Sequence, residues 1–507
     1  MVVEILADFF YMKQHPRFPV INKSRQGFDP HSSFLIPHSS LFLFLKEEGI
    51  RLNIIIVGNG KVGYTLAQYL SKDGHDITIL DRSQQALNKA SETLDVMCIR
   101  GNGANVKTLI EANVESADVI IAVTGNDELN MVCCLAAKQL GAKYTIARIR
   151  DPEYTESLTL LQKKLDIDQV ANPERSAALE ISRLLRFPFA INVETFAHGR
   201  VEMVEFRTEE RDAILNTPLS RLHGRYPRIQ FTAVQRNGSA FIPDGSSILL
   251  PGDRVYATGD RESVTRFFKQ LGKDTQRLKS ALLIGGGHIS YYLARIIAGM
   301  GVYLRLIEID EKKCLRLADQ LDGVMVINAD GTDTEVLESE NLADCGALIC
   351  LTNRDEENLI TGMYGSRHGV KKVIVKVNRL NTMDIMEDLG IDCAISPKLT
   401  TANAILRSVR ALNNSRNSVV EKVYYMMGGQ VEAYEFTALE GAPYLNIPLN
   451  KLNIRKGILV SVLVRERKCI IPFGSDEIEA GDTVILTAKA GTVVNLEDAF
   501  DITEIRK

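Results

Sequence analysis

The amino-acid sequence predicts an α/β fold with two doubly wound parallel-sheet units, each followed by a small α+β lobe. The first observation behind this prediction is that apolar, strand-like runs alternate with helical patterns from Leu52 onward, which is typical of a parallel sheet covered by helices. The second is a glycine-rich turn directly after the first apolar run. The third is that the whole pattern recurs, because a second glycine-rich turn follows the first at a distance of 227 residues (Gly58 to Gly285).

The first half begins with a strand, a glycine-rich turn and a helix. The β-branched run Ile54–Val57 predicts a buried strand, and residues 64–72 are expected to form the helix. The glycines between them, Gly58, Gly60 and Gly63, allow a tight turn that aims backbone N–H groups and the positive end of the helix dipole at a pyrophosphate. The motif indicates a Rossmann-like unit that binds a nucleotide or dinucleotide; a packing turn without a ligand is the alternative.

Three polar residues accompany this turn at the same edge of the predicted sheet. Asp81 ends the second predicted strand and lies 23 residues after Gly58, close to the spacing of a ribose-binding acid. Thr124 and Arg148 directly follow two later strands. Because ligands lie outside the carboxyl ends of parallel strands, we expect these side chains to meet at one site, where Arg148 is either a solvated charge or a phosphate contact. The expected strands are 76–80, 96–99, 119–123 and 144–147, and the expected helices are 84–93 and 128–140.

The second half repeats the first in several separate places. The turn Gly285–Ser290 matches the first turn, and Glu308 stands 227 residues after Asp81. Lys376 stands at the position of Arg148. Several matches at nearly one offset indicate a tandem duplication. The serine that ends the second turn replaces the third glycine, where a small side chain costs little, so we expect a second nucleotide site.

A helix and a small β-rich module follow each predicted sheet unit. Pro173 and Pro397 each precede a helical stretch, and proline in the first helical turn is a start signal. The dipeptides Gly252-Asp253 and Gly481-Asp482 lead into apolar strands and serve turns rather than catalysis. The apolar face of each helix is explained either by packing within the chain or by a crossover that pairs subunits or halves. The expected bounds are 1–51 for an extension, 52–173 and 278–397 for the sheet units, 174–190 and 398–416 for the linker helices, and 191–275 and 417–500 for the lobes.

The composition argues against several classes of function. There are 60 Lys and Arg against 64 Asp and Glu, a net charge of −4, so no basic excess favours nucleic acid. No apolar run approaches the ~20 residues that cross a bilayer, so we expect a soluble protein. The eight cysteines have no C-x-x-C spacing, which favours a reducing cytoplasm, and the scattered histidines indicate no metal site. Residues 1–51 stand outside the repeated pattern and are expected to be a poorly ordered extension or an artefact of start-site choice.

From Leu52 onward the chain resembles the TrkA-type regulatory subunits of Trk potassium uptake systems, with one regulator-of-potassium-conductance (RCK) domain in each half. The resemblance rests on Val57–Gly63, Asn126–Asn130, Ile146–Pro152 and the two Gly–Asp leads. It implies binding of NAD(H) and of ATP or ADP, without catalytic residues. It also implies a homo-oligomer, expected to be a tetramer, that forms a ring beneath a Trk-type potassium-translocating membrane subunit. The protein would then be cytoplasmic and held at the inner face of the membrane by its transporter partner.

The same resemblance implies a role for each residue of the two clefts. The turn Gly58–Val62 would hold the diphosphate, Asp81 the adenosine ribose and Arg148 a phosphate. Thr124 and Gly125 would line the base or nicotinamide, and the second half would repeat these parts. The predicted cofactor-binding residues are Gly58, Asn59, Gly60, Lys61, Val62, Gly63, Asp81, Thr124, Gly125, Arg148, Gly285, Gly286, Gly287, His288, Ile289 and Glu308.

Two other functions are kept as alternatives. A nicotinamide-dependent oxidoreductase would need a general acid or base near the nicotinamide, but no tyrosine has a lysine four residues later and no His–acid pair accompanies the first cleft. An RCK-type regulator of another cation transporter would share the same cytoplasmic chemistry. As for the cofactor, the carboxylate of Asp81 repels a 2′-phosphate, which favours NAD over NADP, although Arg82 is adjacent.

Overall fold

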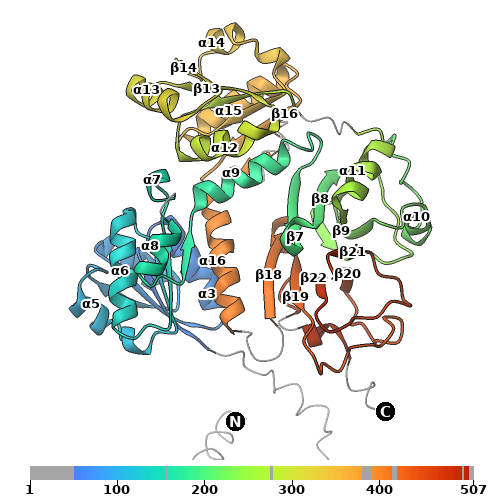
Figure 1. The fold of residues 1–507 in the computed structure, drawn as a ribbon, viewed down its shortest axis with the longest axis horizontal. Coiled ribbons are helices and arrows are strands. Elements are labelled where there is room, and N and C mark those ends of the chain that lie inside the picture. The colour runs from blue at the N-terminus through green and yellow to red at the C-terminus, as the bar shows by residue number, and fades with distance from the viewer. Residues whose placement is uncertain are drawn as a thin grey trace, which may run out of the picture. The chain divides into compact units, whose positions relative to one another are not determined.

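The computed structural model describes residues 51–155, 158–273, 278–378, 391, 393–413, 419–493 and 496–501 (Figure 1). The expected N-terminal extension, residues 1–51, therefore lies outside the described residues apart from Arg51. Within the described ranges, none of the helices has both the length and the apolar composition needed to cross a membrane.

The first half folds around a six-stranded parallel sheet with the order β3-β2-β1-β4-β5-β6. Alternate side chains of β1 enter two different apolar cores: Ile54 and Ile56 enter one, and Ile55 and Val57 the other. Since β1 pairs with β2 on one side and β4 on the other, the strand order reverses between β1 and β4, where such sheets bind ligands. The strands are β1 Asn53–Val57, β2 Asp76–Asp81, β3 Met97–Arg100, β4 Val119–Ala122, β5 Tyr144–Arg148 and β6 Gln169–Ala171.

Several predicted boundaries in this unit differ from the structure by one to three residues. Helix α3 begins at Lys61 rather than at residue 64, because Gly60 already serves as its N-cap and the turn is correspondingly short. Strand β3 is displaced by one residue from the predicted range, since its pairing with β2 runs from Met97 to Arg100. The helices are α3 Lys61–Lys72, α4 Gln84–Thr93, α5 Val106–Glu111, α6 Asp127–Gln139, α7 Pro152–Thr155, α8 Leu158–Lys164 and the linker helix α9 Pro173–Leu184.

The second half has the same architecture, which confirms the predicted duplication. Its parallel sheet has the order β14-β13-β12-β15-β16-β17, the same connectivity as the first. The first glycine of each turn, Gly58 and Gly285, has a φ of +100°. The elements are β12 Ser280–Ile284, α12 His288–Ile297, β13 Tyr303–Glu308, α13 Glu311–Gln320, β14 Val324–Asn328, α14 Thr334–Ser339, β15 Ala347–Cys350, α15 Asp355–Arg367, β16 Lys372–Lys376, β17 Cys393–Ile395 and the linker helix α16 Pro397–Asn413.

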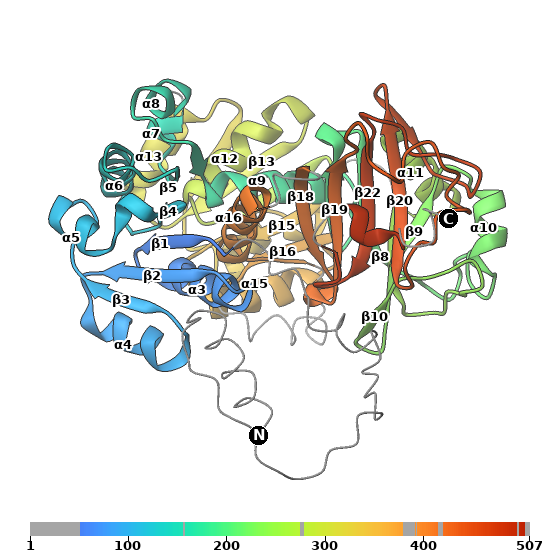
Figure 2. The ribbon, with the colours of Figure 1, turned by 90° about the horizontal axis from the view of Figure 1, so that it is seen from below.

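An antiparallel five-stranded sheet follows each parallel unit, so the predicted fold class is confirmed. The lobes share an apolar core that contains Phe196 and Tyr256 from the first lobe and Met426 and Val462 from the second. Figure 2 shows the strands of the second lobe beside β8 and β9 of the first. The elements are β7 Asn192–Phe196, β8 Val201–Arg207, α10 Leu219–Arg225, β9 Gln230–Arg236, β10 Ser239–Phe241, β11 Arg254–Asp260, α11 Arg261–Gln270, β18 Val419–Met426, β19 Val431–Thr437, β20 Ile458–Arg465, β21 Lys468–Ile470 and β22 Thr483–Lys489.

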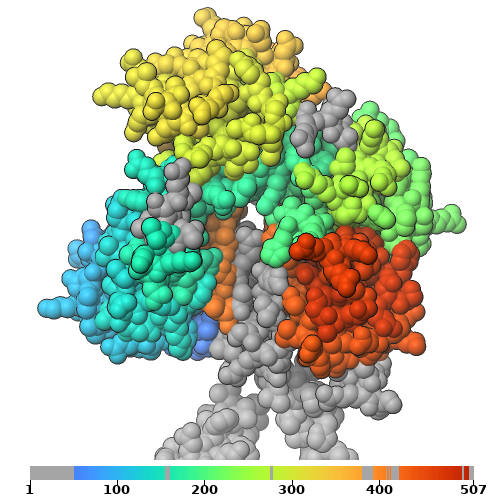
Figure 3. All heavy atoms as spheres, viewed as in Figure 1, coloured from blue at the N-terminus to red at the C-terminus, as the bar shows by residue number. Residues whose placement is uncertain are grey.

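The two linker helices are exchanged between the halves. Helix α16 packs against α3 of the first unit, where Ile405 shares a core with Leu66. Helix α9 packs against α12 of the second unit, where Ile181 shares a core with Leu293. In Figure 3 the orange atoms of α16 lie against the blue and teal atoms of the first unit. The linker helices therefore pack within the chain and pair its two halves.

Candidate functional site

A pocket with a volume of about 550 Å³ opens at the carboxyl edge of the first sheet. Eight of the ten residues predicted for the first cleft line it. The other two lie behind the turn: Asn59 is buried and its side chain donates to the Ala86 carbonyl, and Gly63 packs against Gly58. The structure thus brings the predicted residues together, while their binding of a nucleotide stays a prediction. The eight lining residues are Gly58, Gly60, Lys61, Val62, Asp81, Thr124, Gly125 and Arg148.

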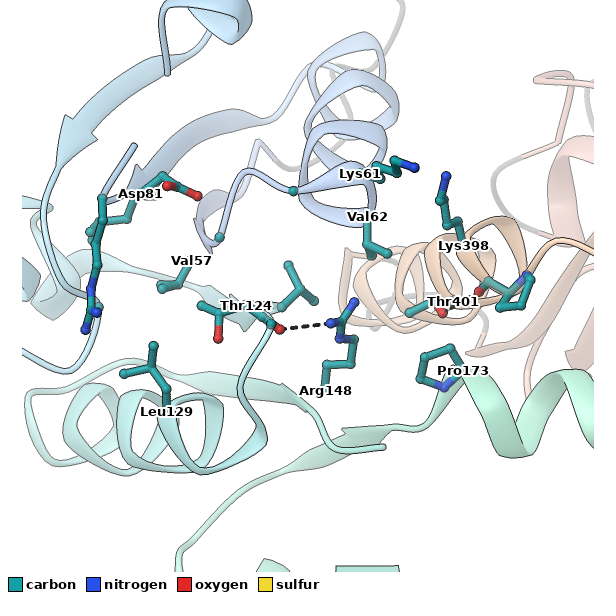
Figure 4. Close-up of a pocket in the computed structure, with 18 of the residues that line it drawn as sticks. Val57, Lys61, Val62, Asp81, Thr124, Leu129, Arg148, Pro173, Lys398 and Thr401 are labelled. Carbon is teal, nitrogen blue, oxygen red and sulfur yellow. Dashed lines mark hydrogen bonds between the residues drawn. The ribbon is translucent and has the colours of Figure 1, made fainter. Parts of the chain in front are cut away.

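The far wall of the pocket comes from the first turns of both linker helices, which the sequence analysis missed. Pro173 begins α9, and Pro397 and Lys398 begin α16. Figure 4 shows Pro173, Lys398 and Thr401 at the end of the pocket opposite Asp81. The matched prolines were the sequence signal for two helix starts, but nothing in the sequence tells which unit each helix will cover.

The glycine-rich turn has the shape that a phosphate group requires. A Cβ at Gly58 would lie 2.9 Å from the backbone nitrogen of Thr124, and a Cβ at Gly63 would lie 1.9 Å from the Gly58 carbonyl oxygen. A Cβ at Gly60 would meet nothing within 4 Å, and Gly60 begins α3 without a side-chain cap. The uncapped N–H groups of the first turn of α3 therefore lie at the pocket, an arrangement that fits a diphosphate.

Asp81 is fixed at the wall of the pocket by two backbone N–H groups. Its Oδ2 accepts a hydrogen bond from Asn59 N at 2.6 Å, and its Oδ1 accepts one from Ser83 N at 2.8 Å. Each carboxylate oxygen has a second lone pair, so the same group can also accept from ribose hydroxyls. The two bonds fix the orientation of the carboxylate relative to the glycine-rich turn.

The turn after β4 is held by Asn130, a residue that the sequence analysis quoted but did not assign to the site. Its Oδ1 accepts from Thr124 N at 2.9 Å and from Thr124 Oγ1 at 2.7 Å, and its Nδ2 donates to the Arg148 carbonyl at 2.8 Å. Asn358 makes the same three bonds in the second half, at 2.9, 2.8 and 2.9 Å. This recurrence at an offset of 228 was the available signal. Asn130 positions both Thr124 and Arg148.

Arg148 places an unused donor beside the pocket. Its Nη2 donates to the Thr124 carbonyl at 2.9 Å, and its Nε is buried with no hydrogen-bond partner among the described residues. Burial lowers the pKa of the guanidinium, and the neighbouring Arg150 lowers it further. A buried cation with an unsatisfied N–H gains from an anionic partner, which fits the predicted phosphate contact.

The second cleft repeats this geometry with two changes. Glu308 accepts from Gly286 N at 2.7 Å and from Asp310 N at 3.0 Å, as Asp81 does in the first half. The hydroxyl of Ser290 donates to the Gly285 carbonyl, so the serine is accommodated at the third position of the turn. The predicted residues 285–289 and Glu308 thus lie together at the edge of the second sheet.

Lys376 takes the place of Arg148 in the second half. Its Nζ donates to Asn353 Oδ1 at 3.0 Å. Burial lowers its pKa to about 8, while Asp355 and Glu174 act in the opposite direction. The second cleft therefore presents a cation whose charge depends on pH, in contrast to the permanently charged guanidinium of the first.

Two family models each match the chain twice, once in each half. The TrkA-N domain family matches residues 54–173 and 281–397, and the TrkA-C domain family matches residues 203–272 and 433–501. These ranges cover the parallel-sheet units and the antiparallel lobes. The chain therefore belongs to the TrkA family and carries its domains, the RCK regulatory domains of potassium uptake systems, in tandem.

Individual relatives agree with this assignment. A Trk system potassium uptake protein TrkA homolog of Methanosarcina mazei is 33% identical over 464 residues, which is 89% of this chain and 100% of the relative. A TrkA homolog of Archaeoglobus fulgidus is 33% identical over 452 residues, with 89% and 100% covered. The solved structure of the GsuK channel bound to NAD shares the fold at a TM-score of 0.58 and 17% identity, covering 87% of this chain and 77% of that one.

Proposed function

We propose that this protein is a cytoplasmic nucleotide sensor that binds NAD(H), ATP and ADP in its first cleft and gates a Trk-type potassium uptake membrane protein. The observation that carries the proposal is the pocket itself, in which the uncapped start of α3, Asp81 and Arg148 converge. Its 550 Å³ volume suits a nucleotide. The names of the relatives, Trk system potassium uptake proteins, support the assignment of the partner.

In this proposal the adenosine diphosphate half of each ligand takes the same position. The diphosphate lies at Gly60 and the start of α3, the ribose at Asp81, and the base or nicotinamide beside Thr124 and Gly125. The ligands then compete, because they share this half. Binding of NAD by the GsuK channel, which has the same fold, supports NAD as a ligand. The buried Arg148 Nε, which has no hydrogen-bond partner among the described residues, supports a phosphate at its end of the pocket.

The exchanged helices supply a mechanism for sensing. The pocket has one wall from the first unit and one from α16, which the second half contributes. In this mechanism the two walls move between an open and a closed arrangement. A ligand shifts the equilibrium between the two arrangements only if its affinity for them differs. Ligands that fill the far end differently therefore set different spacings between the first unit and α16, and a ring of subunits transmits that spacing to the pore.

The proposal also includes a tetrameric ring that the transporter holds at the inner face of the membrane, with the domain bounds expected from the sequence. It further includes the absence of a catalytic role. The ionisable side chains that line the described pocket are lysine, arginine, aspartate and glutamate, without histidine or tyrosine. The described lining thus offers no Tyr–Lys or His–acid pair of the kind that supplies the general acid or base in a nicotinamide-dependent reductase, which supports a sensor.

The test is a transport measurement in proteoliposomes that contain a Trk-type membrane subunit. Rubidium uptake is followed with and without this protein while NADH, ATP and ADP are titrated. We expect uptake to depend on nucleotide only when the protein is present. Equal rubidium uptake with and without the protein at every nucleotide concentration would contradict the proposal. Catalytic consumption of NADH with a carbonyl substrate would favour the oxidoreductase, and a nucleotide-dependent effect on another cation transporter would favour the other regulator.

A further inference from the structure

One carboxylate oxygen at the start of α9 is buried without a hydrogen-bond partner. Glu174 is the second residue of this helix and lines the pocket of the first unit. Its Oε2 is shielded from solvent and accepts no hydrogen bond among the described residues. Figure 4 shows Pro173, the residue before it, among the residues that line the pocket. Such a carboxylate is costly, so either neighbouring cations compensate its charge or a proton removes it.

The start of α9 is fastened to both parallel-sheet units. Asn172, the N-cap of α9, donates from Nδ2 to the Tyr292 hydroxyl at 3.0 Å, and that hydroxyl donates to the Arg150 carbonyl at 2.9 Å. Tyr292 belongs to α12, the helix after the second glycine-rich turn, and Arg150 follows β5 of the first sheet. Glu174 therefore lies between the carboxyl edge of the first sheet and the glycine-rich turn of the second.

The cations around Glu174 come from both clefts. Burial raises the pKa of its carboxyl, while Arg150 and Arg148 of the first unit and His288 of the second act in the opposite direction. The carboxylate in turn favours the charged form of Lys376 in the second cleft. One buried anion is thus shared between the positive groups of two sites.

Other charged groups limit how far these cations can compensate Glu174. Arg150 also pairs with Asp127, with 3.1 Å between Nε and Oδ1, and Asp355 also acts on Lys376. The remaining charged residues that line the pocket are Lys61, Asp81, Arg82 and Lys398.

We propose that Glu174 couples the two clefts through one shared proton: a phosphate group in either cleft makes Glu174 take up a proton from the solvent, and the neutral carboxyl then favours a phosphate group in the other cleft. The inference rests on the proposed nucleotide binding and extends it to the second cleft. A phosphate beside Arg148 adds negative charge near Glu174, and a phosphate at the second glycine-rich turn does so beside His288. Two ligands that favour the same state of one group strengthen each other's binding reciprocally.

The test is calorimetric titration of the full chain with NAD in pairs of buffers that differ in ionisation enthalpy, which counts the protons taken up. NAD is the probe because its diphosphate is esterified at both ends, whereas a terminal phosphate itself exchanges a proton near neutral pH. The titrations cover about pH 5.5 to 8, on both sides of the ordinary histidine pKa of about 6.5.

We expect the wild-type chain to take up protons as NAD binds, so its affinity for NAD rises as the pH falls, by about tenfold per pH unit for each whole proton. Because one proton serves both clefts, the first equivalent of NAD should take up more of it than the second. Glu174→Gln should bind NAD more tightly than the wild type at about pH 8, since the repulsive charge is gone, and should lose this proton uptake.

Three variants serve as controls. His288→Gln removes the neighbouring histidine, and the uptake that belongs to Glu174 should persist in it. Glu174→Asp keeps a titratable carboxyl and should retain proton uptake. Glu92→Gln, an exposed glutamate of α4, should behave as the wild type.

The outcomes separate this inference from the function on which it rests. Equal proton uptake by the wild type and Glu174→Gln, equal uptake with both equivalents of NAD, or binding of a single equivalent would overturn the coupling while leaving nucleotide binding intact. A wild-type chain that binds no NAD, ATP or ADP would overturn the proposed function instead. Unfolding curves of Glu174→Gln that match the wild type show that a changed proton uptake is not a change of fold.

Discussion

Gly63→Ala tests whether the first glycine-rich turn is as tightly packed as the structure indicates. The added Cβ would lie 1.9 Å from the Gly58 carbonyl oxygen and 3.5 Å from a side-chain carbon of Ile56. Ordinary contacts begin at about 3.4 Å, so the turn and α3 must separate by more than an ångström. Overpacking of this kind costs about 1–3 kcal/mol. The separation also moves the start of α3 away from the diphosphate position.

The second half shows how a side chain can be accommodated at this position of the turn. Ser290 occupies the position that corresponds to Gly63, and its hydroxyl bonds to the Gly285 carbonyl. A Cβ can therefore be accommodated there when the hydroxyl bonds to the same carbonyl that the Cβ crowds. Alanine lacks that hydroxyl, so Gly63→Ala should cost more than Gly63→Ser.

The assay is thermal unfolding combined with calorimetric titration of NADH. We expect Gly63→Ala to lower the unfolding temperature of the first unit by roughly 3–10 °C and to weaken NADH binding. Gly60→Ala is the matched control, because its Cβ meets nothing within 4 Å and its φ is −71°. The control should cost no more than about 1 kcal/mol, because it loses only the preference of the N-cap position for glycine over alanine and adds no clash. An unchanged unfolding temperature for Gly63→Ala would refute the reasoning.

Three further predictions follow from the two clefts. Asn130→Ala leaves Thr124 N without its acceptor and should cost about 1–3 kcal/mol in urea unfolding; a loss no larger than that of an exposed Asn→Ala change would show that the network is dispensable. Asp81→Asn should raise the affinity for NADPH relative to NADH about tenfold in calorimetry, since the repulsive carboxylate is gone, and an unchanged ratio would reject Asp81 as the ribose reader. Burial lowers the pKa of Lys376 to about 8, so between this value and the ordinary value of about 10.4 the unfolded chain binds a proton that the folded chain releases. The free energy of unfolding should therefore rise from pH 8 to 10 in the wild type relative to Lys376→Met, and urea unfolding curves with the same pH dependence in both proteins would contradict the assignment.

The fold and much of the first cleft follow from local patterns in the sequence. Four β-branched residues before Gly58, an acid 23 residues later and the recurrence of both define a parallel sheet with its ligand edge. The start of α3 was misplaced because glycines weaken a helical pattern, although Gly60 is the N-cap. Local patterns therefore locate the elements better than they locate the ends of those elements.

The residues that the sequence analysis missed act across long distances in the chain. Asn130 holds the Arg148 carbonyl, and that bond exists only once β5 lies beside β4. Lys398 reaches the first cleft because α16 covers α3 rather than its own unit. The apolar stripe of a helix shows that it will be covered, but not by which partner.

The exchanged helices also affect how the chain folds as it is synthesised. The face of α3 that contains Val62 and Leu66 is covered by Ala402 and Ile405, which are made more than 300 residues later. At a synthesis rate of about 5–20 residues per second, this face stays uncovered for roughly 15–65 seconds after its own synthesis. During that interval the newborn first unit exposes an apolar groove that chaperones, or the α16 of a neighbouring nascent chain, can occupy before its own helix emerges.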